Sequence, residues 1–154
     1  MKEVFAIGFS LSKTWSYQAK KEGIDRAGSF DAFFEKAQSE LSKSIDSKTS
    51  ENQLQKLRKH DGWMWIYGDS NYPAILKQIP NPPLLIYGQG RPQLDQENLL
   101  ALIGTRQPTP YGKRIAQLLA KDLVREGLIL VSGLARGIDS IAHKVSGIGD
   151  SKLL

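Results

Sequence analysis

The sequence predicts an α/β fold in which a parallel sheet begins in the last third of the chain, after a small helical N-terminal region. Two continuous apolar runs, at 99–103 and 128–131, have the length and composition of buried strands. An amphipathic helical pattern separates them, and a second one starts near residue 138. A helical crossover joins parallel strands, so the two runs are predicted to lie side by side with the same direction.

Residues 1–60 are polar and mostly helical in pattern. Ser29 is a suitable N-cap for a helix whose apolar face has helical spacing: Phe30, Phe33, Phe34, Ala37 and Leu41. Residues 42–53, rich in Ser, Lys and Asn, are predicted as a loop or linker. A short basic helix around Leu54 and Leu57 follows, and Asp61-Gly62 is expected to end it.

Residues 61–97 are predicted as a lead-in of extended strands and turns. Trp63–Tyr67 has strand composition, and Asn71-Tyr72-Pro73 is typical of a turn. A proline-rich turn then precedes a strand at Leu84–Tyr87, which Gly88 is expected to end. The tryptophans and tyrosines of this segment are able to stack on nucleic-acid bases, but we expect them to be core residues.

The region 98–146 carries the two strands of the parallel sheet with their helices. Thr109 and Pro110 are typical of a helix start, and Gly127 of a helix end. The packing face of this first helix is predicted from its spacing: Ile115, Ala116, Leu119, Ala120 and Leu123. The second helix is predicted to pack through Ile138, Ile141, Ala142 and Val145.

A glycine and an arginine follow each strand of this sheet, in Gly104-Thr105-Arg106 and in the segment 132–137. Glycine lets the chain turn sharply and lets a ligand approach the backbone, and arginine suits phosphate oxygens. Since parallel strands end at one edge of a sheet, both turns are predicted to face one anion-binding crevice. Two ordinary turns with solvated arginines are the alternative. The candidate residues are Gly104, Thr105, Arg106, Lys113, Ser132, Gly133, Arg136 and Gly137.

Other site chemistries have weaker support. Arg106 and Pro108 do not fit the glycine pattern of dinucleotide-binding turns. Asp139 and His143 are spaced to pair on a helix, but Ser132 lies in no nucleophile elbow, so a hydrolase is disfavoured and Asp139 is expected to favour the helix start. No metal site is predicted, because the only histidines, His60 and His143, are far apart in sequence and cysteine is absent.

Charge and hydropathy restrict the class of protein further. A formal net charge of +5 is consistent with an anionic partner such as nucleic acid, or with an ordinary basic protein. No apolar run approaches the ~20 residues that a membrane helix needs, and the first residues do not resemble a secretion signal. We expect a cytoplasmic protein without membrane partners.

The sequence resembles the DNA-processing protein A family (DprA, also called Smf). The resemblance covers about residues 68–144 and rests on these motifs: Tyr72-Pro73 with Leu76, residues 79–88, Ile103-Gly104-Thr105-Arg106 with Thr109-Pro110-Tyr111-Gly112, and residues 131–139 with Ala142-His143. Residues 1–60 match weakly, in the place of the small helical domain of many members.

The resemblance implies the first half of a Rossmann-like domain at 98–146 that binds single-stranded DNA, without a cofactor and without enzymatic activity. It implies a role in natural transformation, where family members protect incoming DNA and deliver it to the RecA recombinase. Arg106 takes the position of the family arginine at the DNA pocket, and Gly104, Thr105, Ser132 and Gly133 fall on the loops that face DNA.

The sequence departs from the family after His143. Members continue with glycine, alanine and leucine and with further strands, whereas this chain has a divergent tail at 147–154, so a C-terminally truncated member is expected and the family's homodimer is doubtful. Strands left without cover predict marginal stability or dependence on a partner, and cooperative unfolding of the monomer at high temperature would contradict this. The alternatives are a non-functional or interaction-only fragment, and a nucleotide-processing Rossmann-like hydrolase, whose P-G-G-x-G-T-x-x-E signature is absent.

Overall fold

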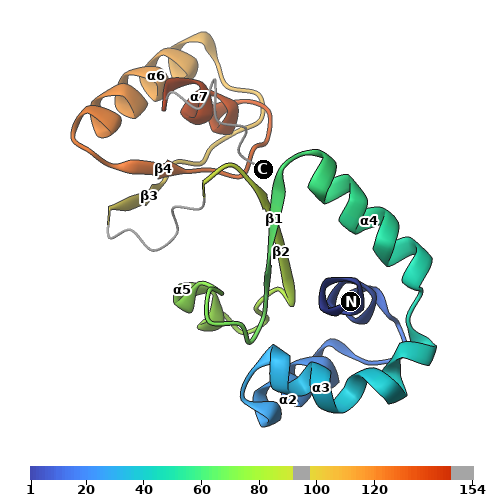
Figure 1. Ribbon diagram of the computed structural model, residues 1–154. Helices are drawn as coiled ribbons and strands as arrows, with labels where there is room; N and C mark the ends of the chain where they lie inside the picture. The colour runs from blue at the N-terminus through green and yellow to red at the C-terminus, as the bar shows by residue number, and fades with distance from the viewer. Residues whose placement is uncertain (92–97, 147–154) are drawn as a thin grey trace. The chain divides into compact units, whose positions relative to one another are not determined.

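The computed structural model describes residues 1–91 and 98–146, which belong to two compact units, Met1–Gln89 and Gly90–Leu154 (Figure 1). The divergent tail expected at 147–154 and the end of the lead-in, 92–97, lie outside the described residues. The first unit contains α1 (Lys2–Leu11), α2 (Tyr17–Ala27), α3 (Phe30–Leu41), the 3₁₀ turn η1 (Ser42–Ser44), α4 (Ser47–Lys59), β1 (Gly62–Ile66), α5 (Ala74–Lys77) and β2 (Leu85–Gln89). The second contains β3 (Leu99–Ala101), α6 (Pro110–Arg125), β4 (Ile129–Val131) and α7 (Ile138–Val145).

The helices of the first unit surround a cluster of phenylalanines. Ser29 caps α3 as predicted, because its side-chain oxygen accepts the N–H of Ala32 at 3.1 Å. Phe30 and Phe34 are buried on the predicted face of α3, and the Phe34 ring meets the Phe5 ring of α1 edge-on at 5.1 Å. Aromatic burial of this kind is a large source of core stability.

The predicted linker at 42–53 is wrong, because its second half is helical. Asp46 caps α4, and its carboxylate accepts the backbone N–H of Thr49 at 3.0 Å and the Thr49 hydroxyl at 2.7 Å. Serine and aspartate are common in loops because they bond to nearby backbone, and the same property makes them helix caps. Ser50 and Leu54 then bury one face of α4.

Strands β1 and β2 pair antiparallel, with Trp63 opposite Gly88. The expectation that the aromatics are core residues holds for Trp65, Tyr67 and Tyr72, which are buried, and is wrong for Tyr87, which is 38% exposed. Gly88 does not end the strand as predicted but lies within it. A Cβ there would overlap the Trp63 indole, so the glycine leaves room for the ring that crosses it.

Asp69, in the turn after β1, gives the first unit a pH-dependent stability. Its side chain is 18% exposed, and the Lys2 ammonium lies 3.6 Å from its buried Oδ1, which accepts no hydrogen bond from the described residues. Burial raises the pKa of the Asp69 carboxyl above its usual value, and the charge of Lys2 opposes this only in part. Ionised Asp69 therefore destabilises the fold.

We expect Asp69→Asn to stabilise the protein at pH 7. When folding raises the pKa of a carboxyl group, the free energy of unfolding of the protein decreases as the pH rises from the unfolded-state pKa through the folded-state pKa. The two proteins should therefore have similar free energies of unfolding near pH 4. As the pH increases, the variant should become more stable than the wild type. Urea unfolding followed by circular dichroism measures this, and a variant that is less stable at pH 7 would contradict the sign.

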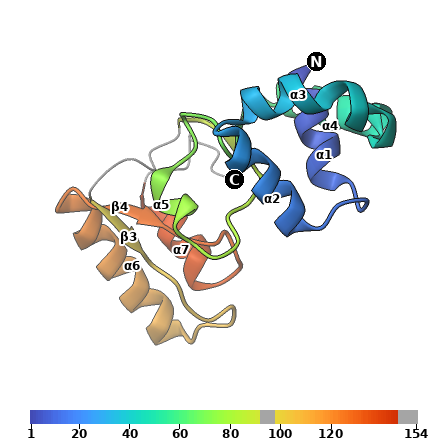
Figure 2. The ribbon, with the colours of Figure 1, turned by 90° about the horizontal axis from the view of Figure 1, so that it is seen from below.

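In the second unit, β3 and β4 are parallel, as the crossover predicts, and α6 and α7 cover the same face of this pair (Figures 1 and 2). Leu130 is buried against Ala120 of α6 and Ala142 of α7. The Thr109 hydroxyl oxygen accepts the N–H of Gly112 at 3.1 Å, which confirms the predicted cap of α6. The strands are shorter than the apolar runs, since neither Ile103 nor Leu128 is part of one.

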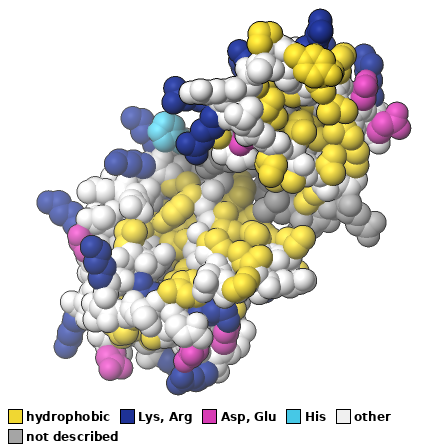
Figure 3. All heavy atoms as spheres, turned by 180° about the vertical axis from the view of Figure 1, so that it is seen from behind, with side chains coloured by type: hydrophobic (Ala, Val, Ile, Leu, Met, Phe, Trp, Pro, Cys, Tyr) yellow, Lys and Arg dark blue, Asp and Glu magenta, His cyan; other side chains and the backbone are white. Residues whose placement is uncertain are grey.

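Among the described residues, this sheet is not covered on both faces, as expected for strands left without cover. Leu100 and Val131 are 38% and 39% exposed, and Ile103 is 73% exposed. Leu119, predicted on the packing face of α6, is 51% exposed, because the small residues Ala116 and Ala120 form the contact instead. Figure 3 shows a broad group of hydrophobic side chains on this unit. No helix within residues 1–91 and 98–146 is long and apolar enough to cross a membrane.

Candidate nucleic-acid interface

The loops that follow β3 and β4 are in direct contact. The hydroxyl of Ser132 donates to the carbonyl of Leu102 at 2.6 Å, and the N–H of Ile138 donates to the carbonyl of Thr105 at 3.2 Å. Both bonds join residues of one loop to the strand end or loop of the other. The structure therefore brings the two arginine-bearing turns together at one edge of the sheet, as expected for neighbouring parallel strands.

Two glycines make this close approach possible. A Cβ on Gly104 would lie 2.7 Å from Cγ1 of Ile138, so a side chain at Gly104 would push the loops apart. Gly137 has a φ of +95°, which L residues rarely adopt, and a Cβ there would overlap the carbonyl oxygen of Thr105 and lie 2.8 Å from Cα of Arg106. Position 137 thus requires glycine both for its backbone conformation and because Thr105 leaves no room for a side chain.

The side chains of Thr105 and Ser132 are partly used within the loops. The Thr105 hydroxyl oxygen accepts the N–H of Gln107 at 3.1 Å, which closes a small turn that leaves Arg106 exposed. Ser132 uses its proton in the bond to Leu102, so only its oxygen lone pairs remain for a ligand. Gly133 and Arg136 are exposed on the second loop.

Asp139 supports the second loop rather than a catalytic pair. The residue is 6% exposed, and its carboxylate accepts the N–H of Ala135 at 3.4 Å. The buried Nε2 of His143 has no hydrogen-bond partner among the described residues, so the pair suggested by the spacing of Asp139 and His143 is not formed through that atom. Among residues 1–91 and 98–146, no three histidine or carboxylate side chains are grouped as a metal ion would need.

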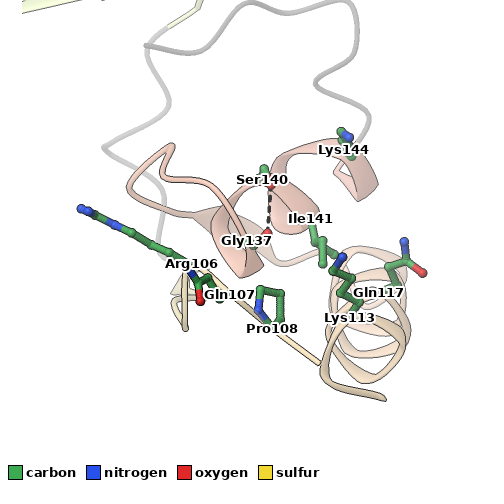
Figure 4. Close-up of a pocket in the computed structure, with 9 residues that line it drawn as sticks. All are labelled: Arg106, Gln107, Pro108, Lys113, Gln117, Gly137, Ser140, Ile141 and Lys144. Atoms are coloured by element: carbon green, nitrogen blue, oxygen red, sulfur yellow. Dashed lines mark hydrogen bonds between the residues drawn. The ribbon is translucent and has the colours of Figure 1, made fainter. Parts of the chain in front are cut away.

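A cavity of about 540 Å³ lies beside the first loop, between α6 and α7 (Figure 4). Three of its lining side chains are cations: Arg106, Lys113 and Lys144. Gln107, Gln117 and Ser140 add neutral polar groups, and Pro108, Gly137 and Ile141 complete the described lining, which includes no acidic residue. Such a lining favours an anion that carries several oxygen acceptors.

The loop and helix residues contribute differently to this cavity. Figure 4 shows the Arg106 side chain extended away from Gly137, while Lys113 and Gln117 project from α6. The hydroxyl of Ser140 donates to the carbonyl of Gly137 at 2.9 Å, within α7's first turn. The Arg106 side chain is therefore exposed and lies on the side of the cavity away from Lys113.

The predicted site residues divide into two groups. Arg106, Lys113 and Gly137 line the cavity, whereas Gly104, Thr105, Ser132, Gly133 and Arg136 form or flank the loops without being part of its described lining. The polar lining residues that were not among the predicted site residues are Gln107, Gln117, Ser140 and Lys144. For Gln117 and Lys144 the sequence held a signal in their spacing, because Gln117 follows Lys113 by one helical turn and Lys144 follows Gly137 by two.

Comparison with known proteins identifies similar chains. Residues 63–149 match the family model described as DNA recombination-mediator protein A. The DNA processing protein DprA of Bacillus subtilis (strain 168) is 41% identical over 76 residues, which cover 49% of this chain and 26% of that protein. The protein Smf of Synechocystis is 35% identical over 112 residues, 67% of this chain and 28% of its own. The chain thus spans about a quarter of the length of these relatives.

One solved structure shows a similar fold over nearly the whole chain. The X-ray structure of DNA processing protein A from Streptococcus pneumoniae aligns with 97% of this chain and 49% of its own, with a TM-score of 0.54 and 23% identity. A structure of DNA processing protein A from Helicobacter pylori, described by its single-stranded DNA binding mode, covers 55% of this chain and 38% of its own, with 35% identity and a TM-score of 0.49.

Proposed function

The chain belongs to the DNA recombination-mediator protein A family, and on this premise we propose that it binds single-stranded DNA at the cavity beside the Arg106 loop. The second unit, in this proposal, is the first half of a Rossmann-like domain. Arg106, on the loop after β3, and Lys113, on α6, bind phosphates of the DNA backbone. The protein acts by binding rather than by catalysis.

The observation that carries the proposal is a cavity, beside the two loops that contact each other, whose lining has three cations and no described acidic residue. Phosphates of nucleic acid are neutralised mainly by lysine and arginine, and arginine adds paired hydrogen bonds to phosphate oxygens. The cellular role we propose, supported by family membership, is DNA uptake in natural transformation, with delivery of the strand to the RecA recombinase in the cytoplasm.

Binding to a fluorescein-labelled oligothymidine of about 20 nucleotides tests the proposal. Fluorescence anisotropy between about 50 and 200 mM salt should give an affinity whose logarithm falls linearly with the logarithm of the salt concentration. Each phosphate contact on a single strand contributes a slope of about −0.7, so three cations predict a slope near about −2. An absence of binding at the lowest salt concentration would contradict the proposal and favour the interaction-only alternative, and turnover of a mononucleotide would favour the hydrolase.

A further inference from the structure

We propose that the DNA strand lies lengthwise between α6 and α7, and that Lys144 binds a second phosphate beyond the one held by Arg106. This inference rests on the proposed function and extends it from the loops to the helices. In this inference, Lys144 contributes to the binding of a strand with several phosphates and not to the binding of a single phosphate.

The residues of α7 that line the cavity form one continuous face. Gly137, Ser140, Ile141 and Lys144 are separated by three, one and three positions, which places them on one side of a helix. At 1.5 Å per residue, Gly137 and Lys144 are about 10 Å apart along the axis. The cavity therefore extends along the helix and is not confined to the loop.

The facing side of α6 runs along the same cavity. Lys113 and Gln117 are one turn apart, about 6 Å along the helix axis, and both line it. The two helices pack through Ala116, Ile138 and Ile141, so the cavity lies above a fixed helix pair. The α6 side of the cavity carries the Lys113 cation and the Gln117 amide, and the α7 side carries the Lys144 cation.

The spacing fits more than one phosphate. Consecutive phosphates of a stacked strand advance by about 3.4 Å along the axis, so a cavity about 10 Å long accommodates several nucleotides. A single phosphate beside Arg106 leaves the Lys144 end without an anion. Between the two ends, Pro108 supplies apolar surface for a sugar or a base face, and Gln117 supplies an amide for hydrogen bonds.

Substitution of Lys144 separates this arrangement from binding at the loop alone. We expect Lys144→Ala to weaken binding of a ten-nucleotide oligothymidine about threefold to tenfold at about 50 mM salt, and to reduce the magnitude of the salt slope by about 0.7. The affinity for thymidine 5′-monophosphate, measured by competition, should not change, because one phosphate binds at the Arg106 end. Lys144 is exposed, so its removal should leave the unfolding temperature unchanged.

Lys121→Ala is the matched control. Lys121 is an exposed lysine one turn beyond Gln117 on α6, and it is not part of the described cavity lining. It should retain the wild-type affinity and slope. Equal oligonucleotide binding by the Lys144→Ala and Lys121→Ala variants would overturn the inference and leave the proposed function intact, as would an equal loss of mononucleotide and oligonucleotide binding in the Lys144 variant. Failure of the wild-type protein to bind the oligonucleotide would overturn both.

Discussion

Gly137→Ala is expected to reduce single-stranded DNA affinity by at least about tenfold and to destabilise the second unit by roughly 2–4 kcal/mol. Two costs combine at this position. A φ of +95° is strained for alanine, and its Cβ would overlap the carbonyl oxygen of Thr105. Relief of the overlap requires the two loops to separate, which breaks the bond from Ile138 to Thr105 and displaces Arg106. Anisotropy measures the loss of affinity, and urea unfolding followed by circular dichroism measures the loss of stability.

Gly127→Ala is a matched control for the backbone cost. Gly127 also has a positive φ, of +81°, but no atom lies within 4 Å of the point that a Cβ would occupy, so alanine there meets strain without overlap. We expect it to cost about 1 kcal/mol and to leave DNA affinity unchanged. If both variants lose the same stability and both bind DNA normally, the contact between the loops does not organise the site.

Arg106→Ala is expected to weaken single-stranded DNA binding about tenfold to a hundredfold without changing the unfolding temperature. Hydrogen bonds to a charged group contribute about 1.5–3 kcal/mol, and the guanidinium provides two of them to one phosphate. Arg106 is exposed and extends away from Gly137, so the fold does not depend on it. Affinity is measured by anisotropy at fixed salt.

Two further variants define what Arg106 contributes. Arg106→Lys should recover part of the affinity, because it keeps the charge and loses the planar donor pair. Arg114→Ala removes an exposed arginine of α6 that is not among the described lining residues, and it should bind as the wild type does. Equal affinity of the Arg106→Ala and wild-type proteins would show that Arg106 takes no part in binding.

Local chemistry made much of this fold predictable. Ser29 and Thr109 cap their helices as expected because capping depends only on a side chain and the next few backbone amides. The parallel pairing of β3 and β4 follows from the helical connection between them, and this pairing brings the two loops together. The loop predicted at 42–53 was wrong because the same residue types occur in loops and as helix caps. Packing of Leu54, which is buried, favours the helix.

The remaining features depend on which elements become neighbours. Leu119 has the spacing of a packing residue, but alanines on the adjacent line of α6 allow a closer helix contact and leave the leucine outside. Lys144 and Gln117 belong to helix faces, and their relation to the Arg106 loop emerges only when α6 and α7 lie against each other. The need for glycine at position 88 also depends on a neighbouring element, since the Trp63 ring that requires it comes from another strand.

The exposed leucines and Ile103 of the second unit have a consequence for how unfolding is observed. Environment-sensitive dyes fluoresce when they adsorb to apolar surface, and they normally report denaturation because folded proteins display little of it. Here the native protein offers such surface, so a dye-based melting scan should begin with a high signal and yield a blunted transition. Ellipticity is therefore the suitable readout for the second unit, because Trp15, Trp63 and Trp65 all belong to the first unit.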